Sequence, residues 1–156
     1  MLGIFDKLFS RKQGKSKSGE FEISDMPKEL KDLVVRLGLT VPKMCFMNSF
    51  LTVMQTLSKD EFDIHYVLVE ITSDTGYTFE HAVIKWNGHY YDPTLEPQNL
   101  HKQTKYRLQK EFSPETIMKM MIEKFGLDHI KLMIEGNAPF WPLKINEHGE
   151  YDFIDA

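Results

Sequence analysis

Few local sequences dictate backbone geometry as strongly as the Asn87-Gly88 pair, which separates two runs of β-forming residues. A type I′ turn requires positive φ at both central residues, and Asn-Gly is the pair that adopts this geometry most readily. The pair therefore predicts a two-residue hairpin within residues 79–94. A loop of this length also fixes the strand register, with Trp86 opposite His89.

The same register brings a histidine close to a carboxylate. It places Val83 opposite Asp92 and His81 opposite Thr94. Because side chains alternate between the two faces of a sheet, all four point to one face, and His81 is the diagonal neighbour of Asp92. Such a diagonal spans about 7 Å between Cα atoms, which an imidazole–carboxylate hydrogen bond can bridge. The hairpin thus predicts an oriented histidine.

The chain contains one cysteine, Cys45, at the start of an apolar segment with helical spacing. Only the thiolate is a good nucleophile, and both a helix N-terminus and a nearby imidazolium favour it. The spacing predicts a helix over residues 45–57 with Cys45 in its first turn. The apolar positions of this helix are Phe46, Phe50, Val53, Met54 and Leu57.

Cys45, His81 and Asp92 together form a candidate catalytic set of nucleophile, general base and orienting carboxylate. Asn48 and Ser49 follow Cys45 by three and four residues, share its helical face and are candidate supporting residues. Each of these residues also has a structural interpretation. A lone cysteine in an apolar stretch is more often a small core residue, and a single histidine or aspartate in a sheet is usually structural.

Length and charge restrict the class of protein. With 156 residues, the chain is expected to form one domain over residues 21–156, preceded by an amphipathic segment and flexible linker over residues 1–20. A net charge of −4 argues against general nucleic-acid binding. The single cysteine is typical of a reducing compartment, and we find neither a membrane-span pattern nor a signal-peptide pattern. We therefore expect a cytoplasmic protein.

The first residues have a pattern of their own. An apolar helical face is followed by a basic run, and such a segment can lie on an anionic membrane surface, dock in a partner's groove or fold onto the domain. These three alternatives stay open at this point. The apolar residues are Met1, Leu2, Ile4, Phe5, Leu8 and Phe9, and the cations are Arg11, Lys12, Lys15 and Lys17.

The remaining elements complete an α+β fold in which the helix bearing Cys45 packs on an antiparallel sheet. Residues 64–71 are almost continuously apolar and predict a strand buried on both faces, near the centre of the sheet. Residues 127–134 are compatible with either helix or strand. The other expected elements are helices over 27–37 and 114–125, a loop over 95–105, a strand over 106–112 and a hairpin over 143–154.

These residues occur in motifs that resemble a known superfamily. Papain-like and transglutaminase-like cysteine enzymes have a nucleophilic cysteine at the start of a helix, followed by a histidine and an Asp or Asn on adjacent strands. The chain is most similar to an uncharacterised, largely bacteriophage-encoded set with Cys-Phe-x-Asn, His-Ala-Trp and Asp-Pro-Thr motifs, although Val83 stands where that set usually has tryptophan. The matching segments are Cys45-Phe46-Met47-Asn48-Ser49, Tyr66-Val67-Leu68-Val69-Glu70, His81-Ala82 and Tyr91-Asp92-Pro93-Thr94.

The resemblance implies thiol-dependent acyl transfer or amide hydrolysis on a protein or peptide amide, as in peptidases, deamidases, amidases and transglutaminases. Papain-like peptidases keep an oxyanion donor on a glutamine shortly before the cysteine, and no glutamine stands there in this chain. The expected donors are the Cys45 backbone N–H and a second group that the sequence does not identify. The alternative is an inert papain-like scaffold that binds a host or viral protein. In a virus, the expected location is the host cytoplasm.

Neither a metal nor a cofactor is expected. The nearest candidate ligands do not reproduce any closed zinc spacing, and the hairpin register sends His89 to the opposite face from His81. The glycines are scattered and form no phosphate-binding loop. The candidate metal ligands are His81, His89, Asp92 and His101.

Overall fold

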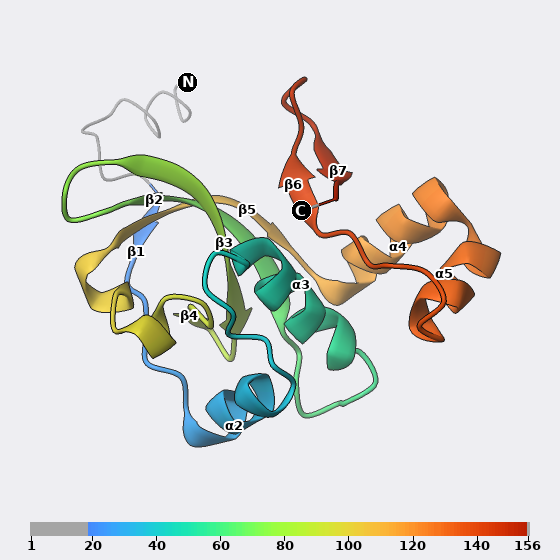
Figure 1. Cartoon of the computed structure of the whole chain (residues 1–156), viewed down its shortest axis with the longest axis horizontal. Helices are drawn as coiled ribbons and strands as arrows, with labels where there is room; N and C mark the ends of the chain where they lie inside the picture. Colours follow the sequence, from blue (N-terminus) through green and yellow to red (C-terminus); the bar gives the residue numbers. More distant parts are fainter. Residues whose placement is uncertain (1–18, 156) are drawn as a thin grey trace, which may run out of the picture.

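The computed structural model describes residues 19–155, which form a mixed α+β fold (Figure 1). These residues form four α-helices, a curled antiparallel sheet of five strands and a separate two-stranded hairpin near the C-terminus. The predicted α+β class is therefore confirmed. The predicted amphipathic segment over residues 1–17 lies outside the described residues.

The sheet has the strand order β1-β5-β2-β3-β4, and every neighbouring pair is antiparallel. The central strand β2 is buried along most of its length, as its continuous apolar sequence predicted. The strands are β1 (Glu20–Phe21), β2 (His65–Thr72), β3 (Thr78–Trp86), β4 (His89–Tyr91) and β5 (Lys105–Phe112).

Each face of the sheet carries its own apolar cluster. Helix α3 (Cys45–Gln55) lies across one face, where Ala82 and Ile84 of β3 join the larger cluster. His81 and Val83 alternate with them and point to the other face. The smaller cluster on that face consists of Ile23, Val67, Val69, Ile71, Val83 and Tyr106.

The remaining helices are α2 (Lys28–Arg36), α4 (Pro114–Phe125) and α5 (Leu127–Ile134). Helix α4 begins as predicted, with the Ser113 hydroxyl accepting the backbone N–H of Thr116, and the structure identifies residues 127–134 as helical. The C-terminal hairpin is also confirmed as β6 (Leu143–Ile145) and β7 (Tyr151–Phe153).

The predicted hairpin is correct near its turn and wrong at its far end. Asn87 and Gly88 both have positive φ, and Trp86 pairs with His89 as expected. The ladder stops at Tyr91, so neither the predicted pair Val83–Asp92 nor the predicted pair His81–Thr94 forms across it. Asp92 ends the ladder because its own Oδ1 accepts the backbone N–H of Thr94 and turns the chain away.

The segment predicted as a loop over residues 95–105 contains two short 3₁₀ turns, η2 (Glu96–Gln98) and η3 (His101–Gln103). A three-residue turn leaves no periodic pattern in a sequence, which explains the omission. In Figure 1 these turns lie beside β1, and the Lys102 ammonium donates to the Ile23 carbonyl there.

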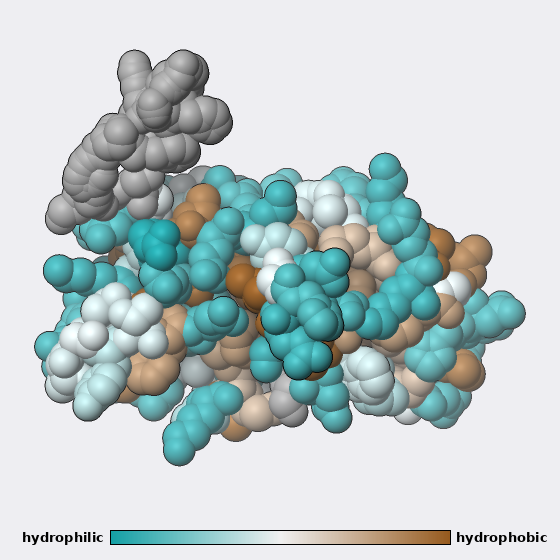
Figure 2. Space-filling view, turned by 90° about the horizontal axis from the view of Figure 1, so that it is seen from above, coloured by the Kyte–Doolittle hydropathy of each residue, from teal (hydrophilic) through white to brown (hydrophobic). Residues whose placement is uncertain are grey.

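The face of the molecule in Figure 2 is predominantly hydrophilic. Figure 2 shows charged and polar side chains interspersed with smaller hydrophobic areas on one face. The longest helix among residues 19–155 is α4 with 12 residues, and no described helix has the length and apolar character needed to cross a bilayer.

Candidate active site

Cys45 is the first residue of helix α3 and is half-buried with a free thiol. The chain enters the helix through Lys43, whose φ of 69° lies in the left-handed region. Met44 at the N-cap makes no side-chain hydrogen bond to the first turn. The N–H groups of that turn have no partner within the helix, so this end is a positive site suited to a thiolate or an oxyanion.

The hydrogen bond predicted from the hairpin is present. His81 Nε2 lies 2.8 Å from Asp92 Oδ2, and both side chains are almost completely removed from solvent. Their separation in the sequence is 11 residues, and the two-residue turn brings them together. The diagonal relation across β3 and the end of β4 therefore produces the expected contact although the ladder itself stops at Tyr91.

Asp92 is buried but fully hydrogen-bonded. Its Oδ1 accepts the backbone N–H groups of Thr94 at 3.0 Å and Leu95 at 2.9 Å. Its Oδ2 accepts the Tyr106 hydroxyl at 2.7 Å and faces His81. A buried carboxylate is tolerated when its oxygens are satisfied in this way, so Asp92 can stay ionised inside the protein.

The pKa values of the pair follow from this arrangement. Burial by itself would lower the pKa of His81, but the charge and hydrogen bond of Asp92, with a smaller contribution from Cys45, raise it to about 10. Burial would raise the pKa of Asp92, and the imidazolium charge, with hydrogen bonds from His81, Tyr106 and Leu95, lowers it below its ordinary value. The charged pair is therefore the stable form at neutral pH.

Cys45 is one of the groups that raise the pKa of His81, after Asp92, so its thiol lies near the imidazole. Because Nε2 is occupied by Asp92, Nδ1 is the ring nitrogen available to exchange a proton with the sulfur. The structure thus brings together all three residues of the set predicted from the sequence. The Cys45 charge also contributes, after burial, to the raised pKa of Tyr66.

The two candidate supporting residues, Asn48 and Ser49, connect helix α3 to other parts of the chain through hydrogen bonds. Asn48 donates from its amide nitrogen to the Val41 carbonyl and to Thr94 Oγ1, both at 2.8 Å. Ser49 donates to the Ala82 carbonyl at 3.1 Å, next to His81 on β3. Both amide hydrogens of Asn48 are used in these bonds, so neither is free to donate to an oxyanion.

Tyr106 is the site residue that sequence reasoning missed. It is buried on β5, and its hydroxyl holds the same Asp92 oxygen that faces His81. Its ring centroid lies 6.3 Å from that of His81. The register between β2 and β5 shifts between Leu68 and Val69, so the alternation of one strand could not be extended to the next from the sequence.

Substitution of Tyr106 by phenylalanine removes the hydroxyl and little else. Hydrogen bonds to charged groups contribute about 1.5–3 kcal/mol, so we expect the free energy of unfolding to fall by about that amount. The pKa of Asp92 is expected to rise because the Tyr106 hydrogen bond lowers it. Urea denaturation and an NMR titration of the Asp92 carboxyl measure the two effects.

The matched control is Tyr77→Phe, because Tyr77 is 67% exposed on the surface. This variant should change neither the free energy of unfolding nor the pKa of Asp92. Equal behaviour of the two variants would show that the Tyr106 hydroxyl does not support the carboxylate.

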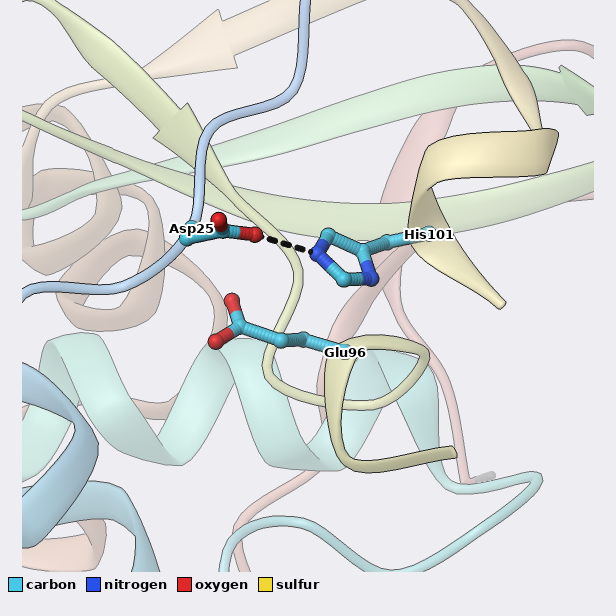
Figure 3. A group of neighbouring side chains, drawn as sticks. All are labelled: Asp25, Glu96 and His101. Carbon is cyan, nitrogen blue, oxygen red and sulfur yellow. Dashed lines mark hydrogen bonds and ion pairs between the residues drawn. The ribbon is translucent and has the colours of Figure 1, made fainter. Parts of the chain in front are cut away.

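A second polar group lies near the site. Asp25, Glu96 and His101 have potential ligand atoms within 4.8 Å of one another, and Figure 3 shows the two carboxylates on the same side of the imidazole. His101 Nε2 is 2.7 Å from Asp25 Oδ1, and Lys31 and Lys102 each lie 3.6 Å from one of the carboxylates. These lysines supply the balancing charge, so the group joins the segment before α2 to the 3₁₀ turns without requiring a cation.

Comparison of the chain with protein-family models, with curated proteins and with solved structures finds no match.

Proposed function

We propose that this protein is a cysteine hydrolase or acyltransferase that acts on amide substrates through Cys45, His81 and Asp92. The observation that carries the proposal is the buried His81–Asp92 hydrogen bond of 2.8 Å with the Cys45 thiol beside the same imidazole. A nucleophile on a helix N-terminus, a base and an orienting carboxylate are the parts that covalent acyl transfer requires.

In the proposed reaction the Cys45 thiolate attacks the carbonyl carbon of the amide. The oxyanion that forms is stabilised by the Cys45 backbone N–H at the end of α3. The His81 imidazolium then donates its proton to the leaving nitrogen as the C–N bond breaks, which leaves a thioester and a neutral imidazole. Water or an amine attacks the thioester, His81 accepts the proton of that nucleophile, and the thiolate is released.

The alternative is an inert scaffold of the same architecture that binds another protein. The raised pKa of His81 favours the enzyme, because it keeps an imidazolium next to the thiol at neutral pH. A papain-like or transglutaminase-like core remains part of the proposal.

Alkylation of Cys45 by iodoacetamide separates the two hypotheses. An ordinary thiol is alkylated about tenfold more slowly for each pH unit below about 8.5, since only the thiolate reacts. We expect alkylation of Cys45 to remain almost constant between about pH 6 and pH 8 in the native protein. The rate is followed by intact mass spectrometry, which counts modification of the single cysteine.

His81→Ala should restore the steep pH dependence of an ordinary thiol. His148→Ala is the matched control, since that histidine side chain is 72% exposed and should leave the profile unchanged. A steep profile in the native protein, identical to that of His81→Ala, would refute the proposed enzyme.

A further inference from the structure

A small apolar cavity borders the segments that carry His81 and Asp92. It has a volume of about 240 Å³, and its apolar lining consists of Ile71, Phe79, Leu95 and Leu100. The sides come from the end of β2, the beginning of β3 and the chain after Asp92. Ile71 belongs to the apolar cluster on the same sheet face as His81. Leu95 packs against that cluster.

The sheet register places this cavity next to the catalytic base. Val69 pairs with His81, and Ile71 pairs with Phe79, so Phe79 is two residues from His81 on the same face. Two residues of an antiparallel strand span about 7 Å. On the opposite side, the Leu95 backbone N–H donates to Asp92 Oδ1 at 2.9 Å. Residues in direct continuity with the base and with its carboxylate therefore form two walls of the cavity.

The lining indicates the chemical class of the occupant. Phe79 is 54% exposed and Leu100 is 37% exposed, so the cavity presents apolar side chains to solvent that a ligand could cover. Asp74 is the one charged residue in the lining and disfavours an acidic group. Sites for drug-sized ligands occupy roughly 300–1,000 Å³, so this smaller cavity suits a single apolar side chain.

Two of the other cavities differ in character. The one near the hairpin turn is lined by charged groups that already pair with one another, among them His65 and Lys85 with Glu111. The one beside β1 includes His101, Lys102 and Lys105. Charged and polar residues make up most of both linings, so the cavity at Phe79 and Leu95 is the best of the three for holding an apolar part of a substrate.

We propose that this cavity is a specificity pocket that takes an apolar side chain of the amide substrate beside the scissile bond. The inference rests on the proposed function of Cys45 and adds a substrate class to it. The pocket would orient the carbonyl group toward the thiol by covering the side chain, because burying apolar surface is favourable and a held substrate reacts faster.

The test uses two chloroacetamides that differ only in the amide substituent, N-methyl and N-benzyl, and measures the second-order rate of Cys45 alkylation by each. We expect the native protein to prefer the benzyl compound by about tenfold, the low end of what a hydrophobic pocket discriminates. Phe79→Ser and Leu100→Ser should each reduce the preference toward unity. Both side chains are partly exposed, so both variants are expected to fold.

Leu132→Ser is the matched control, since Leu132 is 43% exposed on α5, and it should keep the native preference. Equal rates for the two compounds in the native protein would overturn the pocket, as would an unchanged preference in both pocket variants. The iodoacetamide profile of Cys45 is measured in parallel. An activated thiol without benzyl preference removes the pocket alone, whereas an ordinary thiol removes the proposed function and the pocket with it.

Discussion

Substitution of Asp92 by alanine is expected to lower the free energy of unfolding by about 3–5 kcal/mol, as for other buried ion pairs that lose one partner. The variant leaves the His81 ring nitrogen, the Tyr106 hydroxyl and the backbone N–H groups of Thr94 and Leu95 without their acceptor. Each buried donor that loses its partner adds a desolvation cost. Urea denaturation measures the change.

A loss of that size is a large part of the free energy of unfolding of an ordinary domain, and it can leave Asp92→Ala unfolded. The asparagine variant therefore provides a second measurement. Asp92→Asn keeps the shape of the side chain. If the amide nitrogen replaces Oδ2, it faces His81 Nε2 as a donor and favours the imidazole tautomer with its proton on Nδ1. That tautomer cannot accept the Cys45 proton. We therefore expect alkylation by iodoacetamide at about pH 6 to fall about 10²-fold.

Asp32→Ala is the matched control, because the Asp32 side chain is 62% exposed and forms a surface ion pair with Lys28. Exposed pairs contribute about 0–1 kcal/mol, and the control should leave alkylation unchanged. A small stability loss for Asp92→Ala, together with native alkylation in Asp92→Asn, would contradict the assigned role of the carboxylate.

The second large effect concerns the pH dependence of stability. His81 has a pKa raised from 6.5 to about 10, so between these values the folded protein keeps a proton that the unfolded chain releases. Its contribution to stability is complete below about pH 6.5 and is lost as the pH rises toward 10. The expected loss is a few kcal/mol, since each pKa unit corresponds to about 1.4 kcal/mol.

In the native protein, the thiolate proposed for Cys45 would offset this effect. A folded thiolate–imidazolium pair holds one proton, as do the thiol and neutral imidazole of the unfolded chain between about pH 6.5 and 8.5. The free energy of unfolding should therefore depend clearly on pH in the Cys45→Ser variant and only weakly in the native protein. Adding His81→Gln to Cys45→Ser should abolish it.

Urea denaturation at a series of pH values from about 6 to 9.5 tests this in the three proteins. A native protein as pH-dependent as Cys45→Ser would show that no thiolate forms, which opposes the proposed function. A flat profile in Cys45→Ser would show that His81 does not retain its proton in the fold. His148→Gln in the same background should behave as its parent, because His148 is exposed.

Local rules predicted the parts of the site that lie within one hairpin or one helix. The Asn87-Gly88 turn fixed the neighbours of Trp86 and the approach of His81 to Asp92, because a two-residue loop permits one register. The apolar spacing after Cys45 predicted a helix whose first residue is the thiol, and α3 begins there. These features depend on residues close in the chain, so their pattern is visible in the sequence.

Only the tertiary structure decided which distant residues complete the site. Tyr106 reaches Asp92 across a β2–β5 pairing with an irregular register, which no local pattern specifies. Asn48 joins α3 to Thr94, 46 residues away, although spacing alone suggested a place beside the thiol. The physical reason is that alternation and helical period determine which side of its own element a residue occupies, whereas packing and strand pairing determine what it meets there.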